Sequence, residues 1–507
     1  MINSFENRSG SRRGWATFVC LLGLLFLPLV RVAAREDSDK NPWERSVVTL
    51  ELNAKQYDYR QPWITRTKTA QKNGLVIGPR EIITTAEDFS NHTLVRIQKN
   101  GRGKWYNATV QWVDYHANLV SLTAEDDTLW AGLKPAALAR PVPSKEAMHV
   151  VRWRGGKFEV RKAEFNQFLI ADSKTSWVQY LQFEASSEIN GAGWAEPVVI
   201  SDKVVGLATS HGGNTLAVTP SSFIADILEA RKRGTFAGLG FFDFTWQPAE
   251  NPSIAKFFKL TGEPRGVTVI KAPANSELRE HDIILQVDGF AIDTQGDYED
   301  PAYGPLMLEN LATRSKWAGS EVKLQVWRDG QAREVKYRLP KVDFPAKFVP
   351  DRVPDQAPEY LIVGGLVFQP LSNDYLRSWG DDFKRRAPFR LNYFSNDEPT
   401  KERSGVVMLS LILPDPYNLG YQDQRYVPVS EINGRKISRL TDITEALKNP
   451  RDGFHVVDFL RSDNLRRLVL DASETETATR RVLQRYGIKQ DHVFAAAGEK
   501  SPPDAKK

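Results

Sequence analysis

Cysteine is almost missing from this chain of 507 residues. The one cysteine, Cys20, lies inside an apolar run near the N-terminus. The rest of the chain therefore has no disulfide, no cysteine nucleophile and no cysteine ligand for a metal. A thiol-free chain suits an oxidising compartment.

The chain also lacks a strong charge of one sign. Its net charge is +5, of which residues 1–34 contribute three charges, so the remaining chain is nearly neutral. A nearly neutral chain has no electrostatic footprint for nucleic acid. We expect no nucleic-acid partner.

Metal and nucleotide motifs are missing as well. The seven histidines occur in no H-x-x-x-H or H-E-x-x-H spacing, and no P-loop or dinucleotide fingerprint is present. We therefore expect no metal site and no cofactor.

No apolar run is long enough for a membrane-spanning helix. The run from Trp15 to Val30 contains Pro28 and is shorter than the roughly 20 residues required. Arg8, Arg12 and Arg13 precede this run, and the small-residue pattern Val32-Ala33-Ala34 follows it. These features predict a secretory signal peptide over residues 1–34, a periplasmic or secreted protein, and no stable membrane insertion after cleavage. The alternative is an uncleaved membrane anchor.

The region that follows, residues 35–234, has the pattern of many short strands. Alternating runs such as 47–52, 94–97 and 177–183 are separated by turn signals, which predicts a β-barrel or β-sandwich. Residues 221–232 have apolar side chains at helical spacing, and we expect one amphipathic helix to close this domain.

Two further units follow and share a loose internal repeat. Residues 235–342 open with Gly238-Leu239-Gly240-Phe241, and residues 359–494 open with Gly364-Gly365-Leu366-Val367-Phe368. The proline-rich residues 343–358 predict a linker between the units, and residues 495–507 predict a disordered tail.

One bend in the first domain is unusual. Residues 189–197 read Ile-Asn-Gly-Ala-Gly-Trp-Ala-Glu-Pro, and a β-hairpin pattern follows them. Most residues of the bend are small, yet Trp194 lies in its middle.

These phrases resemble the Deg/HtrA serine proteases over nearly all of the chain after residue 34. The resemblance implies a mainly β fold, with a trypsin-like double β-barrel followed by two α+β PDZ-like domains. It also identifies three positions where catalytic residues are replaced. Glu87 stands at the histidine position of Thr84-Thr85-Ala86-Glu87, Asn118 stands at the aspartate position, and Trp194 stands at the nucleophile position.

The replaced residues cannot perform the chemistry of a serine protease. That chemistry needs a hydroxyl, a base and an acid that orients the base. An indole N–H is no nucleophile, and Glu87 has no hydroxyl to activate. The resemblance also places oxyanion-hole donors at the N–H groups of Ala192 and Trp194. Ala192 replaces a glycine, and we expect strain there if its φ is positive.

The sequence therefore predicts a pseudoprotease that binds polypeptides or partner proteins as a chaperone, scaffold or regulatory subunit. One alternative is a serine endopeptidase with a relocated triad, for which His92 and His116 are the candidate bases. Another is an inactive structural subunit of a Deg/HtrA hetero-oligomer.

Binding features remain in both PDZ-like units. In PDZ modules a Gly-Leu-Gly-Phe loop binds a peptide carboxylate, and the next strand pairs with the peptide. The resemblance assigns this role to Gly238, Leu239, Gly240, Phe241 and Phe242. The loop from Gly364 to Phe368 is a weaker match, and its unit could serve assembly instead.

Aromatic residues gather just before the first clear strand of the barrel. One interpretation is that they only cover the bottom of the barrel, and the alternative is an interface between subunits. Deg/HtrA relatives form trimers through aromatic residues near the mature N-terminus, and the resemblance assigns this role to Tyr57, Tyr59 and Trp63. We expect a homotrimer or a multiple of three, in which several PDZ modules add avidity.

Overall fold

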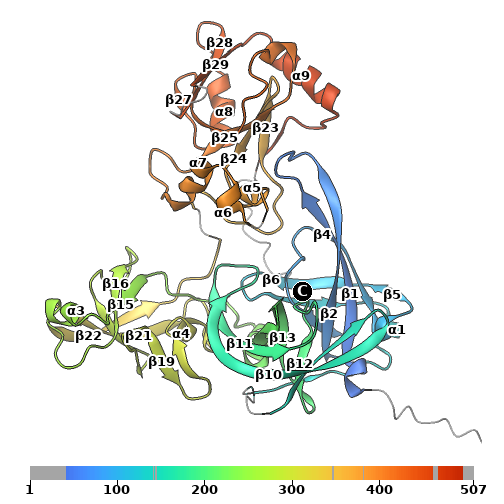
Figure 1. Ribbon diagram of the computed structural model, residues 1–507, viewed down its shortest axis with the longest axis vertical. Coiled ribbons are helices and arrows are strands. Elements are labelled where there is room, and N and C mark those ends of the chain that lie inside the picture. Colours follow the sequence, from blue (N-terminus) through green and yellow to red (C-terminus); the bar gives the residue numbers. More distant parts are fainter. Residues whose placement is uncertain are drawn as a thin grey trace, which may run out of the picture. The chain divides into compact units, whose positions relative to one another are not determined.

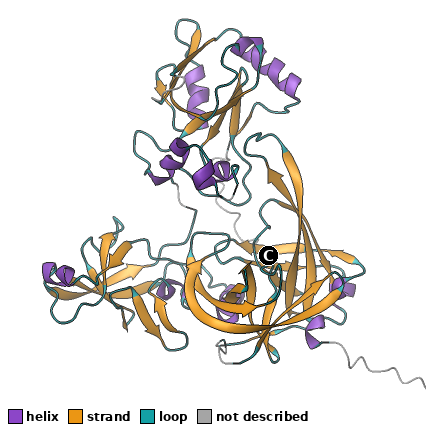
Figure 2. Ribbon diagram, viewed as in Figure 1, coloured by secondary structure: helices purple, strands orange, loops and turns teal. Residues whose placement is uncertain are grey.

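The structure is a computed structural model that describes residues 41–140, 142, 146–344, 347–380, 382–460 and 466–494. The predicted signal peptide and the predicted tail lie outside these described residues. No helix among them combines the length and the apolar character needed to cross a bilayer. Strands dominate the described chain, as Figure 2 shows.

The first sheet contains seven antiparallel strands in the order β5-β4-β1-β2-β3-β7-β6. Figure 1 shows β1, β2, β4 and β5 in shades of blue. Their bounds are β1 Val47–Tyr57, β2 Thr65–Gly78, β3 Glu81–Thr84, β4 His92–Gln98, β5 Trp105–Asn107, β6 Thr109–Asp114 and β7 Leu119–Thr123. Short helical turns flank them, namely η1 Pro42–Arg45, η2 Lys99–Gly101 and α1 Asp127–Trp130. The apolar side chains of this sheet form their own core, which includes Leu50, Ile82 and Leu122.

The second sheet closes on itself into a barrel. Strand β12 pairs with both β9 and β13, so the order β12-β9-β10-β11-β14-β13 returns to its start. The strands are β8 Ala137–Leu138, β9 Met148–Arg154, β10 Lys157–Asp172, β11 Gln179–Ser187, β12 Pro197–Ile200, β13 Lys203–Gly212 and β14 Thr215–Pro220. Helix α2, Ser221–Lys232, has the predicted bounds and buries Phe223, Ile224 and Ile227.

The third sheet lies in the unit predicted as the first PDZ domain. Its order is β15-β16-β17-β21-β22, with β18 beside β17, and β19 and β20 form a separate hairpin. The elements are β15 Thr245–Pro248, α3 Pro252–Phe257, β16 Val267–Lys271, β17 Ile283–Val287, β18 Phe290–Ala291, β19 Asp297–Asp300, β20 Gly304–Met307, α4 Asn310–Thr313, β21 Glu321–Arg328 and β22 Gln331–Arg338. Strand β15 pairs only with β16 among the described strands, so its other edge is open.

The C-terminal unit combines a larger sheet with helices. Its sheet order is β29-β28-β26-β25-β24-β23-β30, with β27 beside β26. The strands are β23 Tyr360–Val363, β24 Leu366–Pro370, β25 Val407–Ile412, β26 Val427–Ile432, β27 Arg435–Lys436, β28 Phe454–Phe459, β29 Arg467–Asp471 and β30 His492–Val493. The helices are α5 Asn373–Arg377, α6 Phe383–Arg386, α7 Phe389–Tyr393, η3 Phe394–Asn396, η4 Pro416–Asn418, α8 Leu440–Leu447 and α9 Thr475–Tyr486.

Candidate functional site: a closed nucleophile turn

The bend at residues 189–197 leads from β11 into β12, and the side chain of Trp194 in this bend is half-buried. The Trp194 carbonyl accepts a hydrogen bond of 2.9 Å from the N–H of Asn73 on β2. Positive φ angles occur at Gly191, Gly193 and Ala195, and Ala192 is not among them. The condition for strain at Ala192, a positive φ, is therefore not met, and Ala195 is the non-glycine residue of the bend that has a left-handed conformation.

A buried carboxylate occupies the turn. Glu196 has 0% exposure, and its Oε2 accepts hydrogen bonds from the N–H groups of Gly193 at 2.8 Å and Trp194 at 2.7 Å. The Trp194 N–H is one of the two predicted oxyanion-hole donors. The carboxylate of Glu196 thus accepts a hydrogen bond from an N–H group that, in an active protease, would stabilise the negative charge developing on the substrate.

A buried arginine holds this carboxylate in place. Arg152 of β9 lies 3.4 Å from Glu196 through Nη1, and its side chain is only 5% exposed. The same guanidinium pairs with Glu159 at 2.9 Å and donates to the carbonyls of Gly191 and Asn190. A planar guanidinium with several fixed donors suits this crosslink between carboxylates and a backbone turn.

The other two replaced residues, Glu87 and Asn118, lie close together. Asn118 is 2% exposed, and its Oδ1 accepts a hydrogen bond of 2.9 Å from the N–H of Ala86, next to Glu87. Its Nδ2 is buried and has no partner among the described residues. An amide holds the backbone as a carboxylate would, but it supplies no negative charge to stabilise a protonated base.

A buried lysine supplies positive charge beneath Glu87. The ammonium of Lys72 donates to the carbonyls of Thr85 at 2.9 Å and Glu87 at 2.7 Å. Burial lowers the pKa of Lys72 to about 8, and the negative charges of Glu87, Asp88 and Glu196 oppose that shift. Burial also raises the pKa of Glu87.

Sequence reasoning missed Glu196, Arg152 and Lys72. A signal existed for Glu196, because it is the one charged residue in a bend made mostly of small residues. No local signal marked Lys72 or Arg152, which come from strands distant in sequence.

The rings of His92 and His116, the two candidate bases of the relocated triad, form hydrogen bonds with residues outside the turn. Nδ1 of His92 is 2.8 Å from the carbonyl of Phe89. Nδ1 of His116 is 2.7 Å from the hydroxyl of Ser176, and the ring packs 4.5 Å from that of Phe344. Burial lowers the pKa of His116.

The carboxylates of Asp114 and Asp343 act on the charge of His116, but among the described residues neither is hydrogen-bonded to its ring. Oδ1 of Asp114 accepts hydrogen bonds from the backbone N–H groups of His116 and Ala117, and its Oδ2 forms an ion pair with Arg231 at 2.8 Å. A triad needs an acid bonded to the ring of the base. Neither oxygen of Asp114 is bonded to that ring.

The predicted interface aromatics lie at and beyond the end of β1. Tyr57 is the last residue of that strand. The hydroxyl of Tyr59 donates to Asp374 at 2.9 Å, and the Trp63 ring packs edge-on against Tyr360 at 6.1 Å. Tyr59 and Trp63 thus contact the C-terminal unit of the same chain.

The first Gly-Leu-Gly-Phe loop leads toward the open edge of β15. The carbonyls of Gly238 and Leu239 accept hydrogen bonds of 2.9 Å from the N–H groups of Ala318 and Val342. Phe241 packs edge-on against Trp177 at 4.8 Å, and Phe242 packs into the core of this unit, 5.1 Å from Phe244. Gly240 is buried beside Leu339, where a β-carbon would approach within 2.9 Å.

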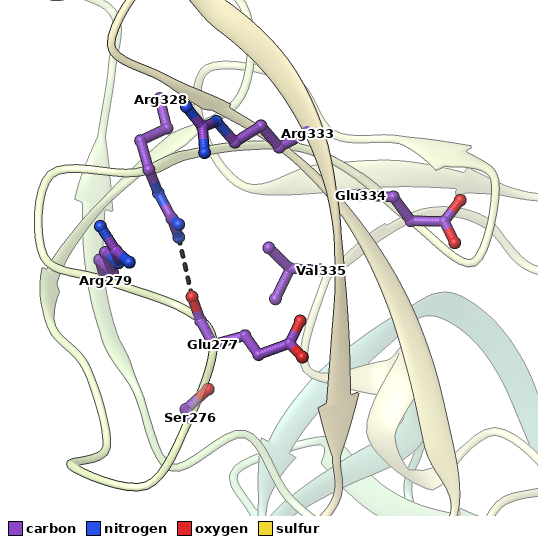
Figure 3. Close-up of a pocket in the computed structure, with 7 residues that line it drawn as sticks. All are labelled: Ser276, Glu277, Arg279, Arg328, Arg333, Glu334 and Val335. Carbon is purple, nitrogen blue, oxygen red and sulfur yellow. Dashed lines mark hydrogen bonds between the residues drawn. The ribbon is translucent and has the colours of Figure 1, made fainter.

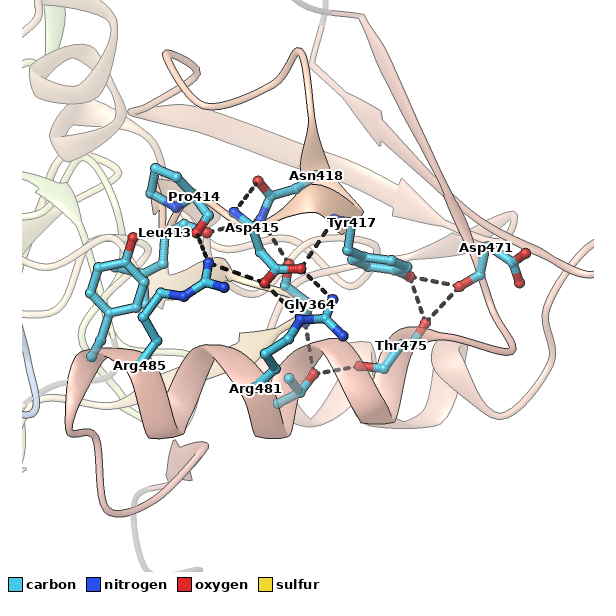
Figure 4. Close-up of polar contacts among 12 residues, drawn as sticks. Gly364, Leu413, Pro414, Asp415, Tyr417, Asn418, Asp471, Thr475, Arg481 and Arg485 are labelled. Atoms are coloured by element: carbon cyan, nitrogen blue, oxygen red, sulfur yellow. Dashed lines mark hydrogen bonds and ion pairs between the residues drawn. The ribbon is translucent and has the colours of Figure 1, made fainter.

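The second loop is closed by its own domain. The N–H of Gly364 donates to the hydroxyl of Thr479 on α9 at 2.8 Å, and its carbonyl accepts from Asn418 at 2.9 Å (Figure 4). Strand β24, which follows the loop, pairs with β23 on one side and β25 on the other. A peptide that adds to a sheet needs an unpaired edge, and β24 has none.

A polar network fixes this closed loop. The buried carboxylate of Asp415 accepts from Arg481 Nε at 2.9 Å, and this bond is the main cause of its lowered pKa. The hydroxyl of Tyr417 lies 2.7 Å from that of Thr475, while its ring covers Gly364 so closely that a β-carbon there would clash (Figure 4). The network ties α9 to the loop and leaves no room for a ligand carboxylate at Gly364.

A polar pocket of about 300 Å³ lies in the unit of the third sheet and contains none of the predicted peptide-binding residues. Arg279, Arg328 and Arg333 line it together with Glu277 (Figure 3). Arg328 is already paired with the buried Asp282 at 2.6 Å and donates to the carbonyl of Glu277 at 2.8 Å. Among the residues that the structure describes, no group of histidine and carboxylate side chains has the arrangement of a metal site.

Comparison with known proteins gives consistent matches. A family model described as "PDZ domain" matches residues 349–493. Two mitochondrial Do-like sequences of Arabidopsis thaliana, numbered 11 and 3, are each 27% identical to this chain. The first match covers 88% of this chain and 74% of the relative, and the second covers 75% and 68%. "Protease Do-like 4, mitochondrial" from the same plant is 25% identical over 84% of this chain and 81% of its own length.

Residues 349–493 thus match a PDZ domain, and most of the chain is similar to Do-like proteases. Among solved structures, "HtrA-type protease AlgW with decapeptide" aligns with 60% of this chain over 97% of its own length, with 12% identity and a TM-score of 0.46. The fold-class prediction is confirmed: the chain is mainly β, with two sheets forming the trypsin-like domain and an α+β PDZ-like region after them.

Proposed function

We propose that this Deg/HtrA-type protein is a pseudoprotease that binds polypeptides and cuts none. The observation that carries the proposal is the Glu196 carboxylate, which is buried on the N–H groups of the nucleophile turn. Trp194 offers no nucleophile, and the turn offers the Trp194 N–H to an internal acceptor rather than to a substrate carbonyl. The loss of a whole catalytic unit costs on the order of 10⁶ in turnover.

The peptide-binding role belongs to the first PDZ-like unit in this proposal. Its strand β15 has an open edge, and the Gly238–Phe242 loop precedes that edge. The second unit, whose loop is closed by Thr479 and whose β24 has two strand neighbours, serves assembly or support. We retain the periplasmic or secreted location as part of the proposal.

The test of inactivity is casein digestion by the purified protein and three variants. Wild type and Trp194→Ser are expected to leave casein intact, because the base and its orienting acid are still absent. The triple variant Glu87→His, Asn118→Asp, Trp194→Ser is expected to stay far less active than the quadruple variant that adds Glu196→Gly. One missing oxyanion donor costs roughly 10²–10³ in turnover. Cleavage by wild type would refute the proposal.

The test of binding uses hydrogen exchange with an added decapeptide. A free C-terminal carboxylate is expected to slow exchange over residues 238–248 and to leave residues 364–370 unchanged. The same peptide with an amidated C-terminus is the control and is expected to bind at least tenfold more weakly. Protection confined to residues 364–370 would contradict the assignment.

Two other functions remain open to test. The His116–Ser176 pair at 2.7 Å is the observation that favours a relocated endopeptidase site. Under that alternative, Ser176→Ala would abolish casein cleavage by wild type. Co-purification of an active Deg/HtrA relative would instead indicate a structural subunit of a hetero-oligomer.

A further inference from the structure

Two aromatic side chains project from helix α7 in the C-terminal unit. Phe389 is 82% exposed and Tyr393 is 55% exposed, and their ring centroids lie 6.1 Å apart. They are four positions apart on the helix and therefore lie on the same face. Large apolar groups gathered in one exposed place mark an interaction site more often than single exposed residues do.

The rest of this segment is firmly packed, so the exposure is not the result of a detached helix. Leu391 is 1% exposed and Ala387 is 6% exposed, and both belong to a core cluster with Tyr375 and Met408. Helix α7 thus has one face in the core and presents the Phe389–Tyr393 face to solvent.

Basic residues precede the two rings in the chain. Lys384, Arg385 and Arg386 end helix α6, just before α7, and all three are exposed. The side chain of Arg385 remains 83% exposed although it lies 3.7 Å from Asp382. Residues 381–393 carry four basic and two acidic side chains.

A half-buried arginine adds a further positive charge. Arg403 donates to the carbonyl of Val429 at 2.8 Å. Burial and, to a smaller extent, the charge of Arg390 lower the pKa of Arg403. An anionic partner would reduce the repulsion between these two cations.

We propose that the aromatic–basic surface, formed by Lys384, Arg385, Arg386, Phe389, Arg390 and Tyr393, docks on an anionic phospholipid membrane. Aromatic rings enter the headgroup region of a bilayer, and lysine and arginine side chains are attracted to anionic lipids beside them. The docking is peripheral and needs no spanning helix. It is independent of whether the barrel is catalytically active.

The shape of the surface favours a membrane over an acidic polypeptide. A peptide is bound in a groove or along a strand edge, where the contacting side chains are already partly covered. Phe389 leaves more than four fifths of its surface in solvent and therefore projects outward. A projecting ring beside several cations suits insertion into a soft, anionic interface.

The first experiment is co-sedimentation of residues 35–507, the protein without its predicted signal peptide, with vesicles of phosphatidylcholine alone or with three parts in ten of phosphatidylserine. We expect at least tenfold stronger binding to the anionic vesicles and a steep loss at high salt. Phe389→Ala with Tyr393→Ala is expected to weaken binding about tenfold. Lys384→Gln, Arg385→Gln and Arg386→Gln together are expected to reduce it to the level of neutral vesicles, since each cation contributes about fivefold.

The matched control is Leu419→Ala, because Leu419 is 77% exposed in the same unit but lies outside the aromatic–basic surface. This control is expected to bind as wild type does. All substituted side chains are exposed, and circular dichroism would check that each variant is folded.

A second experiment locates the contact. Since residues 35–507 contain no cysteine, a polarity-sensitive dye can be placed at Tyr393→Cys or, as control, at Leu419→Cys. Anionic vesicles are expected to shift the emission of the dye at position 393 to the blue and to leave the dye at 419 unchanged.

Equal binding to neutral and anionic vesicles, or binding that none of the surface variants weakens, would overturn the inference. So would binding of a polyglutamate peptide with the same variant and salt dependence in a protein that ignores vesicles. That last result would assign the surface to acidic polypeptides.

Discussion

Replacing Glu196 with alanine tests the closed turn directly. The substitution removes a fully buried carboxylate that two backbone N–H groups and one guanidinium contact. It leaves the N–H groups of Gly193 and Trp194 without their acceptor. Arg152 keeps Glu159 and two backbone carbonyls but loses one of its two carboxylate partners.

The expected loss of stability is about 3–5 kcal/mol. Breaking a buried ion pair from one side costs about that much, and each buried N–H left without a partner costs about 1–3 kcal/mol. We use the lower part of the summed range because Arg152 retains other partners. For a domain of this size, the loss corresponds to a fall in Tm of roughly 6–20 °C.

The assay is urea unfolding of the full chain together with hydrogen exchange over residues 189–196. Exchange there is expected to become much faster in Glu196→Ala. Glu196→Gln, which keeps an acceptor oxygen, is expected to lose about half as much stability. Glu188→Ala changes an exposed carboxylate in the same bend and should stay within about 0.5 kcal/mol of wild type.

The reasoning fails if Glu196→Ala is as stable as Glu188→Ala. That result would mean that the carboxylate does not occupy the turn in solution, and the observation that carries the proposed function would be lost.

Three further predictions concern other parts of the chain. Lys72 has a folded pKa of about 8 against an ordinary value of 10.5, so the unfolded state binds more protons between these pH values and stability rises with pH there. Relative to Lys72→Met, the free energy of unfolding of wild type should rise by up to about 3 kcal/mol from pH 8 to pH 10.5. Urea midpoints that change with pH in the same way in both proteins would contradict this. Asp415→Asn should cost about 1–2 kcal/mol at neutral pH, because Arg481 is 40% exposed and its pairing is partly screened. The pKa of Asp415 is lowered in the folded state, so its contribution is lost as the pH falls through that lowered value, and the gap between the two proteins should close in acid. If Tyr57, Tyr59 and Trp63 form a subunit interface, light scattering should give the mass of a trimer or of a multiple of three. A monomer mass at micromolar concentration would contradict this prediction. So would an oligomer mass that stays unchanged after all three aromatics are replaced with alanine.

The local phrases of the sequence carried much of the site. Glu87, Asn118 and Trp194 were identified because short motifs align position by position without knowledge of the fold. The structure brings Asn118 to the backbone beside Glu87 and joins the Trp194 turn to β2, as a shared site requires. The helix over 221–232 was also predictable, because its apolar spacing is a local property.

The sequence ranked the two glycine loops but did not show why they differ. The loop from Gly364 to Phe368 was the weaker match to a carboxylate-binding loop. Strand pairing supplies the physical difference, since β24 has neighbours on both edges whereas β15 has one. Pairing partners lie far apart in the chain, so no local pattern reports them.

By itself, the sequence determined which chemistry is missing. The chain has tryptophan at the nucleophile position and no cysteine after residue 20. It therefore has no serine or thiol nucleophile at that site, whatever its fold. The tertiary structure decided what takes the place of that chemistry. Glu196 acquires its role from Arg152, and Lys72 acquires its lowered pKa from burial beneath the turn. Burial and ion pairing depend on residues that long-range strand pairing brings together, and this is why the structure, and not the sequence, revealed the closed turn.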